Sequence, residues 1–180
     1  MEHIERIKRE LAYKGSIVDF YRDTVRLPNG KIEEWDLVHH RMGAACVVAV
    51  DDEGKLVMVH QYRPALNRET LELPAGARDS LKEDTSVCAA RELEEETGYR
   101  AGKLRKILSL RTTVAFCDEF IDVYLATELT RTAQHLDEAE SIDVEHISLE
   151  DALARIDRFE IQDSKTVSGI LAYARIVAES

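Results

Sequence analysis

The chain has 180 residues, of which 44% are hydrophobic and 33% are charged, enough for one domain with a proper core and a small additional element. Its formal net charge of −11 argues against a nucleic acid or an anionic membrane as partner, and no apolar run approaches the roughly 18 residues needed to span a bilayer. The charged N-terminus lacks a signal-peptide core, and the three cysteines, Cys46, Cys88 and Cys117, stand in apolar contexts. We therefore expect a cytoplasmic protein with reduced thiols.

The N-terminal segment is predicted to form an arm of its own. Residues 4–11 have a weak helical pattern, and residues 16–27 then alternate as a strand. Pro28-Asn29-Gly30 is typical of a turn, and residues 31–39 follow as the returning strand of a hairpin. We expect residues 1–41 to contain a helix and an antiparallel hairpin sheet.

Residues 42–180 are predicted to form the main domain. Strands are expected at residues 44–50, 55–62, 71–73, 104–111, 120–126 and 143–147, and two closing helices at residues 149–156 and 163–178. The last helix is given a structural role, because these apolar residues recur at core spacing: Val167, Ile170, Leu171, Ala174 and Val177. Strands and helices do not alternate strictly, which favours an α+β or layered α/β fold.

A further helix is predicted in the middle of the chain, from about Asp84 to Thr97. Asp84 or Thr85 can cap its start, and Gly98 fits the position just after its end. Its buried stripe is predicted to consist of Val87, Ala90 and Leu93.

Three glutamates of this helix, Glu92, Glu95 and Glu96, lie three and four residues apart and share one face. Like charges at that spacing cost about 0.2–0.5 kcal/mol per pair. A chain that accepts this cost often holds a hard divalent cation, whose preferred ligands are carboxylate oxygens. The alternative is a solvated acidic face, which is common in a chain so rich in charge.

The segment around these glutamates resembles the Nudix box, G-x5-E-x7-R-E-U-x-E-E-x-G-U, where U is a bulky apolar residue. The matching residues are, in order, Gly76, Glu83, Arg91, Glu92, Leu93, Glu95, Glu96, Gly98 and Tyr99. Six residues rather than five separate the first two, but the extra residue falls in the loop before the helix. The resemblance implies a Nudix fold, with a mixed sheet between helices. It also implies Mg2+-dependent hydrolysis of a nucleoside diphosphate linked to another group, with Mn2+ as a substitute cation.

The resemblance also implies a set of metal ligands. Glu92 and Glu96 are expected to bind the cation directly, with Glu95 beside them and the carbonyl of Ala75 completing the set. Arg91 is expected to orient the glutamates by pairing with them. The alternative to an enzyme is a Nudix-fold module that senses nucleotides without cleaving them, but such modules can lose box glutamates, and all three are present here.

Two further roles are implied outside the helix. Glu83 is expected to support the junction between loop and helix. The catalytic base is expected on a loop well downstream of the box, where Glu140 aligns best and Glu138 is the alternative. Without a catalytic role, the same residues would simply form a solvated acidic loop.

Other segments resemble the ADP-ribose pyrophosphatase branch of the family. They are Gln61-Tyr62-Arg63-Pro64, the run at residues 71–76, the N-terminal hairpin and the segment at residues 160–166. In that branch the N-terminal sheet pairs with a second subunit and the active site takes residues from both. The resemblance therefore implies a homodimer that cleaves ADP-ribose to AMP and ribose 5-phosphate, or cleaves a related nucleoside diphosphate sugar.

Three residues are expected to contact this small-molecule substrate. Arg63 matches a substrate-contacting arginine, although a surface charge on a strand would look the same, and Glu119 matches a glutamate on the ribose side, although it could be a plain loop carboxylate. Trp35 could stack on a base or pack at an interface. Val114 stands where the branch usually has proline, so the sequence leaves the physiological substrate open. It also leaves open the number of metal ions and which phosphorus is attacked.

Overall fold

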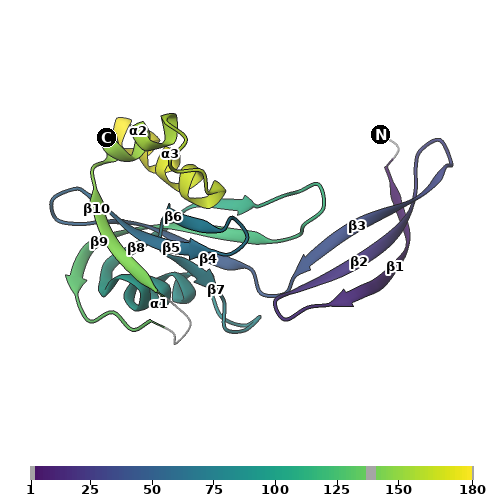
Figure 1. The fold of residues 1–180 in the computed structure, drawn as a ribbon, viewed down its shortest axis with the longest axis horizontal. Coiled ribbons are helices and arrows are strands. Elements are labelled where there is room, and N and C mark those ends of the chain that lie inside the picture. Colours follow the sequence, from purple (N-terminus) through teal and green to yellow (C-terminus); the bar gives the residue numbers. More distant parts are fainter. Residues whose placement is uncertain (1–2, 137–140, 180) are drawn as a thin grey trace. The chain divides into compact units, whose positions relative to one another are not determined.

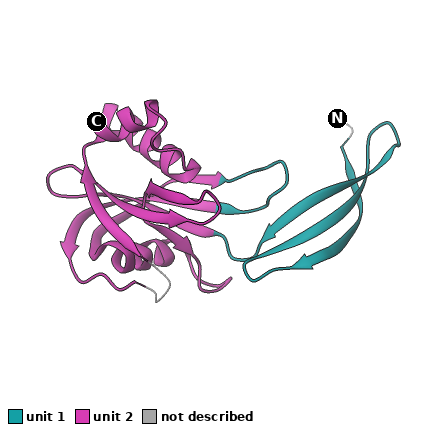
Figure 2. Ribbon diagram, in the orientation of Figure 1, with its two compact units in different colours: residues 1–43, 111–120 teal, residues 44–110, 121–180 magenta. Residues whose placement is uncertain are grey.

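The computed structural model describes residues 3–136 and 141–179, which form two compact units (Figure 2). Unit 1 consists of residues 1–43 and 111–120, and unit 2 of residues 44–110 and 121–180. The predicted domains, residues 1–41 and 42–180, stay a prediction. Unit 1 additionally contains the segment at residues 111–120, which no local pattern connects with the N-terminus.

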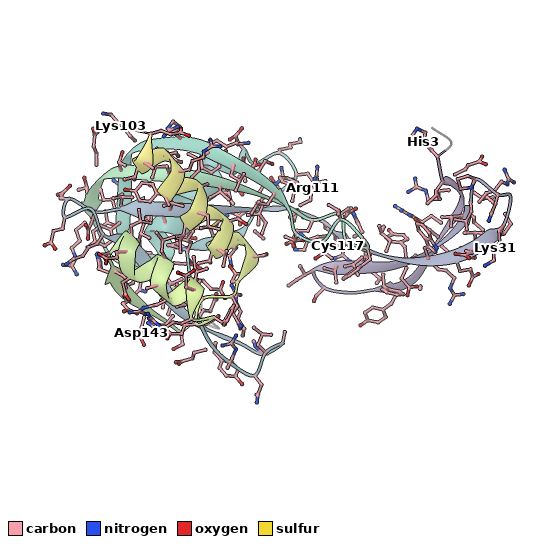
Figure 3. All side chains as sticks on the ribbon, turned by 90° about the horizontal axis from the view of Figure 1, so that it is seen from above. His3, Lys31, Lys103, Arg111, Cys117 and Asp143 are labelled. Atoms are coloured by element: carbon pink, nitrogen blue, oxygen red, sulfur yellow. The ribbon has the colours of Figure 1, made fainter. Side chains whose placement is uncertain are left out.

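Unit 1 contains a three-stranded antiparallel sheet in the order β1-β2-β3 (Figure 1). The strands are β1 (Glu5–Lys14), β2 (Val18–Arg26) and β3 (Ile32–His40). The predicted hairpin is confirmed: Gly30, with a φ of 82°, forms the turn between β2 and β3 and donates its N–H to the carbonyl of Leu27 at 2.8 Å. The segment at residues 111–120, in which Figure 3 labels Arg111 and Cys117, joins β3 through a parallel bridge between Cys117 and Val38.

The prediction of a helix at residues 4–11 is wrong, because residues 5–11 belong to β1. Ile4, Ile7 and Leu11 do recur at helical spacing. However, the register of β1 against β2 is irregular at Ile7 and again at Ala12. Each irregularity inserts one residue and shifts the two-residue alternation of a strand, so the apolar pattern imitates a helix.

The main sheet is mixed and has seven strands among the described residues, in the order β10-β5-β4-β9-β8, with β6 paired to β5 and β7 paired to β4. The strands are β4 (Ala44–Val50), β5 (Leu56–Arg63), β6 (Arg68–Glu72), β7 (Ala75–Ala77), β8 (Tyr99–Arg111), β9 (Phe120–Arg131) and β10 (Ile142–Ile147). The central strand β4 runs parallel to β9 and antiparallel to β5 and β7.

Helices cover both faces of this sheet (Figure 1). They are α1 (Thr85–Thr97), α2 (Leu149–Asp157) and α3 (Ser164–Ala178). Because side chains of a strand alternate between faces, Val47 of β4 packs in one cluster with Leu93 of α1, whereas Val48 packs in the other with Ile170 of α3. The predicted mixed sheet between helices is therefore confirmed. Within the described chain, no helix is long and apolar enough to cross a membrane.

Helix α1 begins and ends where the sequence predicted. The side chain of Asp84 accepts a hydrogen bond of 2.8 Å from the amide of Ser86. Gly98 follows the helix with a φ of 69°, a left-handed conformation that glycine adopts without strain, and donates its N–H to the carbonyl of Glu94 at 2.9 Å.

The predicted buried stripe of α1 is correct only at Leu93. Val87 is 57% exposed and Ala90 is also exposed. The residues that α1 buries are Thr85, Cys88, Ala89, Glu92, Leu93, Glu96 and Thr97. Counting apolar residues misplaced the stripe because two carboxylates occupy the inner face of the helix.

Helix α3 buries part of the predicted face, because Ile170 is fully buried and Val167 packs against the core. Leu171 and Val177 are exposed, and the buried side centres on Thr166, Gly169 and Ile170. A Cβ atom at Gly169 would come within 2.7 Å of the Leu73 side chain. The helix therefore packs closely against the core at its glycine.

The two faces of α1 can be distinguished by mutation. Leu93→Ala should lower the free energy of unfolding by about 2–5 kcal/mol, since truncating a fully buried leucine leaves a cavity. The matched control Val87→Ala should change it by less than about 0.5 kcal/mol. Urea denaturation followed by circular dichroism measures both, and equal losses would contradict the observed orientation of the helix.

Candidate functional site

Arg91 lies at the centre of the charged cluster on α1. Its Nη1 donates to Glu92 at 2.6 Å and to Glu95 at 3.1 Å, and its Nη2 donates to the carbonyl of Ala77 at 3.0 Å. The carboxylate of Glu83 lies 3.4 Å from the same guanidinium. Burial lowers the pKa of Arg91, but Glu83 and Glu92, followed by Glu95, raise it more and leave it above its ordinary value. Arg91 thus offsets the repulsion among the glutamates.

Two glutamates of the predicted metal-binding set, Glu92 and Glu96, approach the backbone of β7. Glu96 is 2% exposed and accepts a hydrogen bond of 3.0 Å from the amide of Ala75. Glu92 is 9% exposed, and a Cβ atom at Gly76 would come within 2.1–2.4 Å of its carboxyl group. Only a glycine at this position lets the strand pass so close to the glutamate.

This donor set fits a hard cation, because it consists of carboxylate and backbone oxygens. In the described part of the chain, no three metal-ligating side chains already converge as a cluster. The guanidinium of Arg91 instead lies between the carboxylates of Glu92 and Glu95. The assignment of Ala75, Glu92, Glu95 and Glu96 as ligands, and of Arg91 as the residue that orients them, therefore stays a prediction.

Glu83 holds the loop that contains the extra residue of the box. Its carboxylate accepts the amide N–H of Asp79 at 2.7 Å, and its carbonyl accepts from Arg78 at 3.2 Å. These contacts agree with a role for Glu83 at the junction of loop and helix.

A second charged cluster, which the sequence analysis did not predict, surrounds Glu72. This carboxylate is 2% exposed and accepts two hydrogen bonds from Arg63, at 2.8 and 2.5 Å, and one from Thr70 at 2.6 Å. Lys165 donates to it from α3, and also to Asp163 at 2.9 Å. Burial raises the pKa of Glu72, but the opposing effect of Arg63 and Lys165 is larger and brings the pKa down to about 2. We call Arg63, Glu72, Asp163 and Lys165 the Glu72 network.

A cavity of about 360 Å3 adjoins this network. Its lining consists of Arg63, Ala65, Leu66, Arg68, Thr70, Glu72, Gln162 and Asp163. The sequence contained one signal for the network: Glu72 stands between Leu71 and Leu73 in a strand next to the core, where a carboxylate is buried only if it is paired.

The other two predicted substrate residues lie in unit 1. Trp35 is partly exposed and lines a cavity of about 490 Å3. The rest of that lining is Phe20, Glu34, Asp36, Val38, Ala115 and Phe116. Glu119 lies 3.7 Å from the ring of His40, and Val114 is 82% exposed in the neighbouring turn. The roles of Trp35 and Glu119 stay predictions.

Glu140 and Glu138, the alternatives for the catalytic base, lie outside the described residues. The flanks of their loop are described. The side chain of Gln134 donates to the carbonyls of Glu96, at 2.7 Å, and Ile142, at 3.2 Å. The chain before and after the loop is thus tied to the last turn of α1.

Comparison with known proteins identifies relatives of this chain. The model of the NUDIX domain family matches residues 39–168. The ADP-ribose pyrophosphatase of Bacillus subtilis is 43% identical over 166 residues, which cover 91% of this chain and 89% of that protein. The methanol dehydrogenase activator of Bacillus methanolicus is 41% identical with the same coverage. A crystal structure of an ADP compounds hydrolase matches with a TM-score of 0.90 over 99% of this chain and 96% of that one; at 17% identity this likeness shows the fold.

The Glu72 network should make stability depend on pH. Because the pKa of Glu72 is lowered in the folded state, its contribution is complete above its ordinary pKa of 4.5 and is lost as the pH falls through about 2. Glu72→Gln should cost on the order of 3 kcal/mol near pH 7, and the wild-type advantage should shrink by more than half by about pH 3. Urea denaturation at a series of pH values measures this, with the exposed Glu69→Gln as control. An advantage that does not depend on pH would contradict the ion pairing.

Proposed function

The chain belongs to the NUDIX domain family, and from this we propose that it hydrolyses the pyrophosphate bond of ADP-ribose, or of a related nucleoside diphosphate sugar. The products from ADP-ribose would be AMP and ribose 5-phosphate. The observation that carries the proposal is the buried carboxylate face of α1, where Glu92 and Glu96 contact the backbone of β7. The Bacillus subtilis relative, named for this activity, supports the choice of substrate.

We propose Mg2+ as the cofactor, with Mn2+ as a substitute. Glu92 and Glu96 would hold it, with Glu95 beside them and the carbonyl of Ala75 as the backbone ligand. The chemistry that such a cation supplies is neutralisation of the diphosphate charge and activation of the attacking water.

The protein's own residues would orient these groups and accept the proton. Arg91 keeps Glu92 and Glu95 in place when their charges would otherwise drive them apart. We propose Glu140 as the general base that removes a proton from the attacking water, with Glu138 as the alternative. Gln134 supports this role, because it ties the flanks of their loop to α1.

We propose that three residues bind the rest of the substrate. A guanidinium such as that of Arg63 suits a phosphate. The indole of Trp35, at an aromatic-lined cavity, suits a nucleobase, and the carboxylate of Glu119 suits the hydroxyl groups of a ribose. Val114 in place of proline keeps other nucleoside diphosphate sugars among the candidates.

We propose a homodimer formed through the sheet of unit 1. All ten residues of the edge strand β1 are exposed. Among the described residues of this sheet, Val25 is the one buried hydrophobic side chain. A three-stranded sheet needs an apolar face packed on something to be stable, and a long exposed edge invites pairing with another chain. A second copy would cover Ile7 and Leu11.

We propose a cytoplasmic location, which the cysteines support. Cys46, Cys88 and Cys117 are free thiols, as is usual in a reducing compartment. Burial raises the pKa of the Cys46 and Cys88 thiols to about 12, so neither is a thiolate nucleophile at neutral pH.

The metal assignment predicts a loss of activity in Glu96→Gln. Removing the charge of a direct ligand should reduce kcat/KM for ADP-ribose at least roughly 100-fold, because even the outer partners of metal ligands contribute about 10–100-fold. Binding of Mn2+, followed by electron paramagnetic resonance, should weaken in parallel. The activity of the wild type would be measured on a panel of substrates that contains ADP-ribose, ADP-glucose, GDP-mannose, NADH, FAD and diadenosine polyphosphates.

Glu94→Gln is the matched control on the same helix. Glu94 pairs with Arg100 at 2.7 Å, away from the carboxylate face, so kcat/KM should stay within about twofold. A Glu96→Gln variant with full turnover and full Mn2+ binding would refute the metal assignment. A wild-type protein that binds ADP-ribose but cleaves no member of the panel would favour a nucleotide-sensing module.

The dimer can be tested by light scattering coupled to gel filtration. The wild type should have twice the 20.4 kDa mass of the chain, and Leu11→Asp should have the mass of one chain, since it places a charge on the exposed sheet. Leu81→Asp, which changes another exposed leucine outside that sheet, should remain dimeric. A monomeric wild type at micromolar concentration would exclude the proposed assembly.

A further inference from the structure

The strands β5 and β6 form an antiparallel ribbon with one strongly polar face. The register pairs Arg63 with Arg68, Gln61 with Thr70 and Val59 with Glu72. Since alternate residues of a strand share a face, these side chains lie on the same side of the ribbon. That side meets the beginning of α3, where Arg68 donates to Gln162 at 2.5 Å and Lys165 donates to Glu72.

Arg63 and Arg68 are direct cross-strand partners, although like charges at such positions repel. Both line the 360 Å3 cavity, together with the carboxylates Glu72 and Asp163. These two positive and two negative groups cancel. Lys165, which is 7% exposed and donates to both carboxylates, adds a third positive charge to these four groups.

Lys165 and Arg63 share the carboxylate of Glu72. Arg63 reaches it along the ribbon with Nε and Nη2, and Lys165 approaches from α3. Without Lys165, Arg63 would be the one remaining cationic partner of this carboxylate among the described residues. The remaining ion pair of Arg63 and Glu72 would then be tighter and locally neutral, so it would attract a phosphate less strongly.

We propose that Lys165 is a positioning residue for substrate binding: acting through Glu72, it fixes the guanidinium of Arg63 at the cavity and leaves it the positive charge that binds the diphosphate of the substrate. The proposal rests on the proposed function, because it assigns Arg63 to substrate.

The electrostatic environment of Arg63 connects the network with the carboxylate face of α1. The pKa of Arg63 is raised chiefly by its hydrogen bonds to Glu72, against the effect of burial, and smaller contributions come from Asp163 and Glu96. The charge of Glu96, on the carboxylate face, therefore also favours the charged form of Arg63.

The test is the steady-state kinetics of Lys165→Met with ADP-ribose. The variant keeps most of the length of the side chain and removes its charge, so KM should rise roughly tenfold while kcat changes less than about twofold. Binding of ADP-ribose in EDTA, measured by calorimetry, should weaken by the same factor. Lys165→Arg should restore most of both values.

Two controls separate positioning from general damage to the fold. Lys106→Met removes the cationic partner of another buried carboxylate, Asp122, to which Lys106 donates at 2.5 Å. It should lower stability and leave KM unchanged. On an Arg63→Met background, Lys165→Met should raise KM no further, because the residue through which it acts is absent.

Several outcomes would overturn the proposal. One is an unchanged KM and dissociation constant in Lys165→Met, and another is full additivity with Arg63→Met. A wild type that binds ADP-ribose without cleaving it would defeat the proposed function alone, because the calorimetric comparison would still test Lys165. A wild type that neither binds nor cleaves ADP-ribose would defeat both.

Discussion

The candidate site depends on the close contact between the carboxylates of α1 and the backbone of β7. Glu92 and Glu96 lie on the inner face of the helix, where burial and mutual repulsion both oppose them. Arg91 offsets the charge of one, and the amide of Ala75 donates to the other. The approach is so close that Gly76 has no room for a side chain. The packing of one helix on one short strand thus brings several oxygen donors together.

The Glu72 network solves the same physical problem on the β5–β6 ribbon. A buried carboxylate is tolerated because an arginine, a lysine and a hydroxyl group donate to it. In both clusters an arginine binds a carboxylate, and Glu72, Glu92 and Glu96 all belong to a strand or a helix. Rigid elements hold such groups more precisely than loops do.

The sheet of unit 1 differs from the rest of the chain, because it buries almost no apolar side chain of its own. Its β1 strand keeps Ile7 and Leu11 exposed and carries two register irregularities. Such a sheet gains little stability from its own apolar packing and needs another surface against its apolar side chains. The proposed pairing with a second copy would bury apolar side chains of this sheet.

The sequence by itself determined the local features of this protein. The bounds of α1 follow from Asp84 and Gly98, the hairpin from Pro28-Asn29-Gly30, and the spacing of the box glutamates from their positions on one helix. Only the tertiary structure decided which way those features face. Val87 points outward because Glu92 and Glu96 take the inner face, β1 is a strand because it pairs with β2, and Glu72 is buried because Lys165, 93 residues away, donates to it. Caps, turns and periodicity act between neighbours in the chain, whereas strand pairing and the burial of charge depend on partners that only the fold brings together.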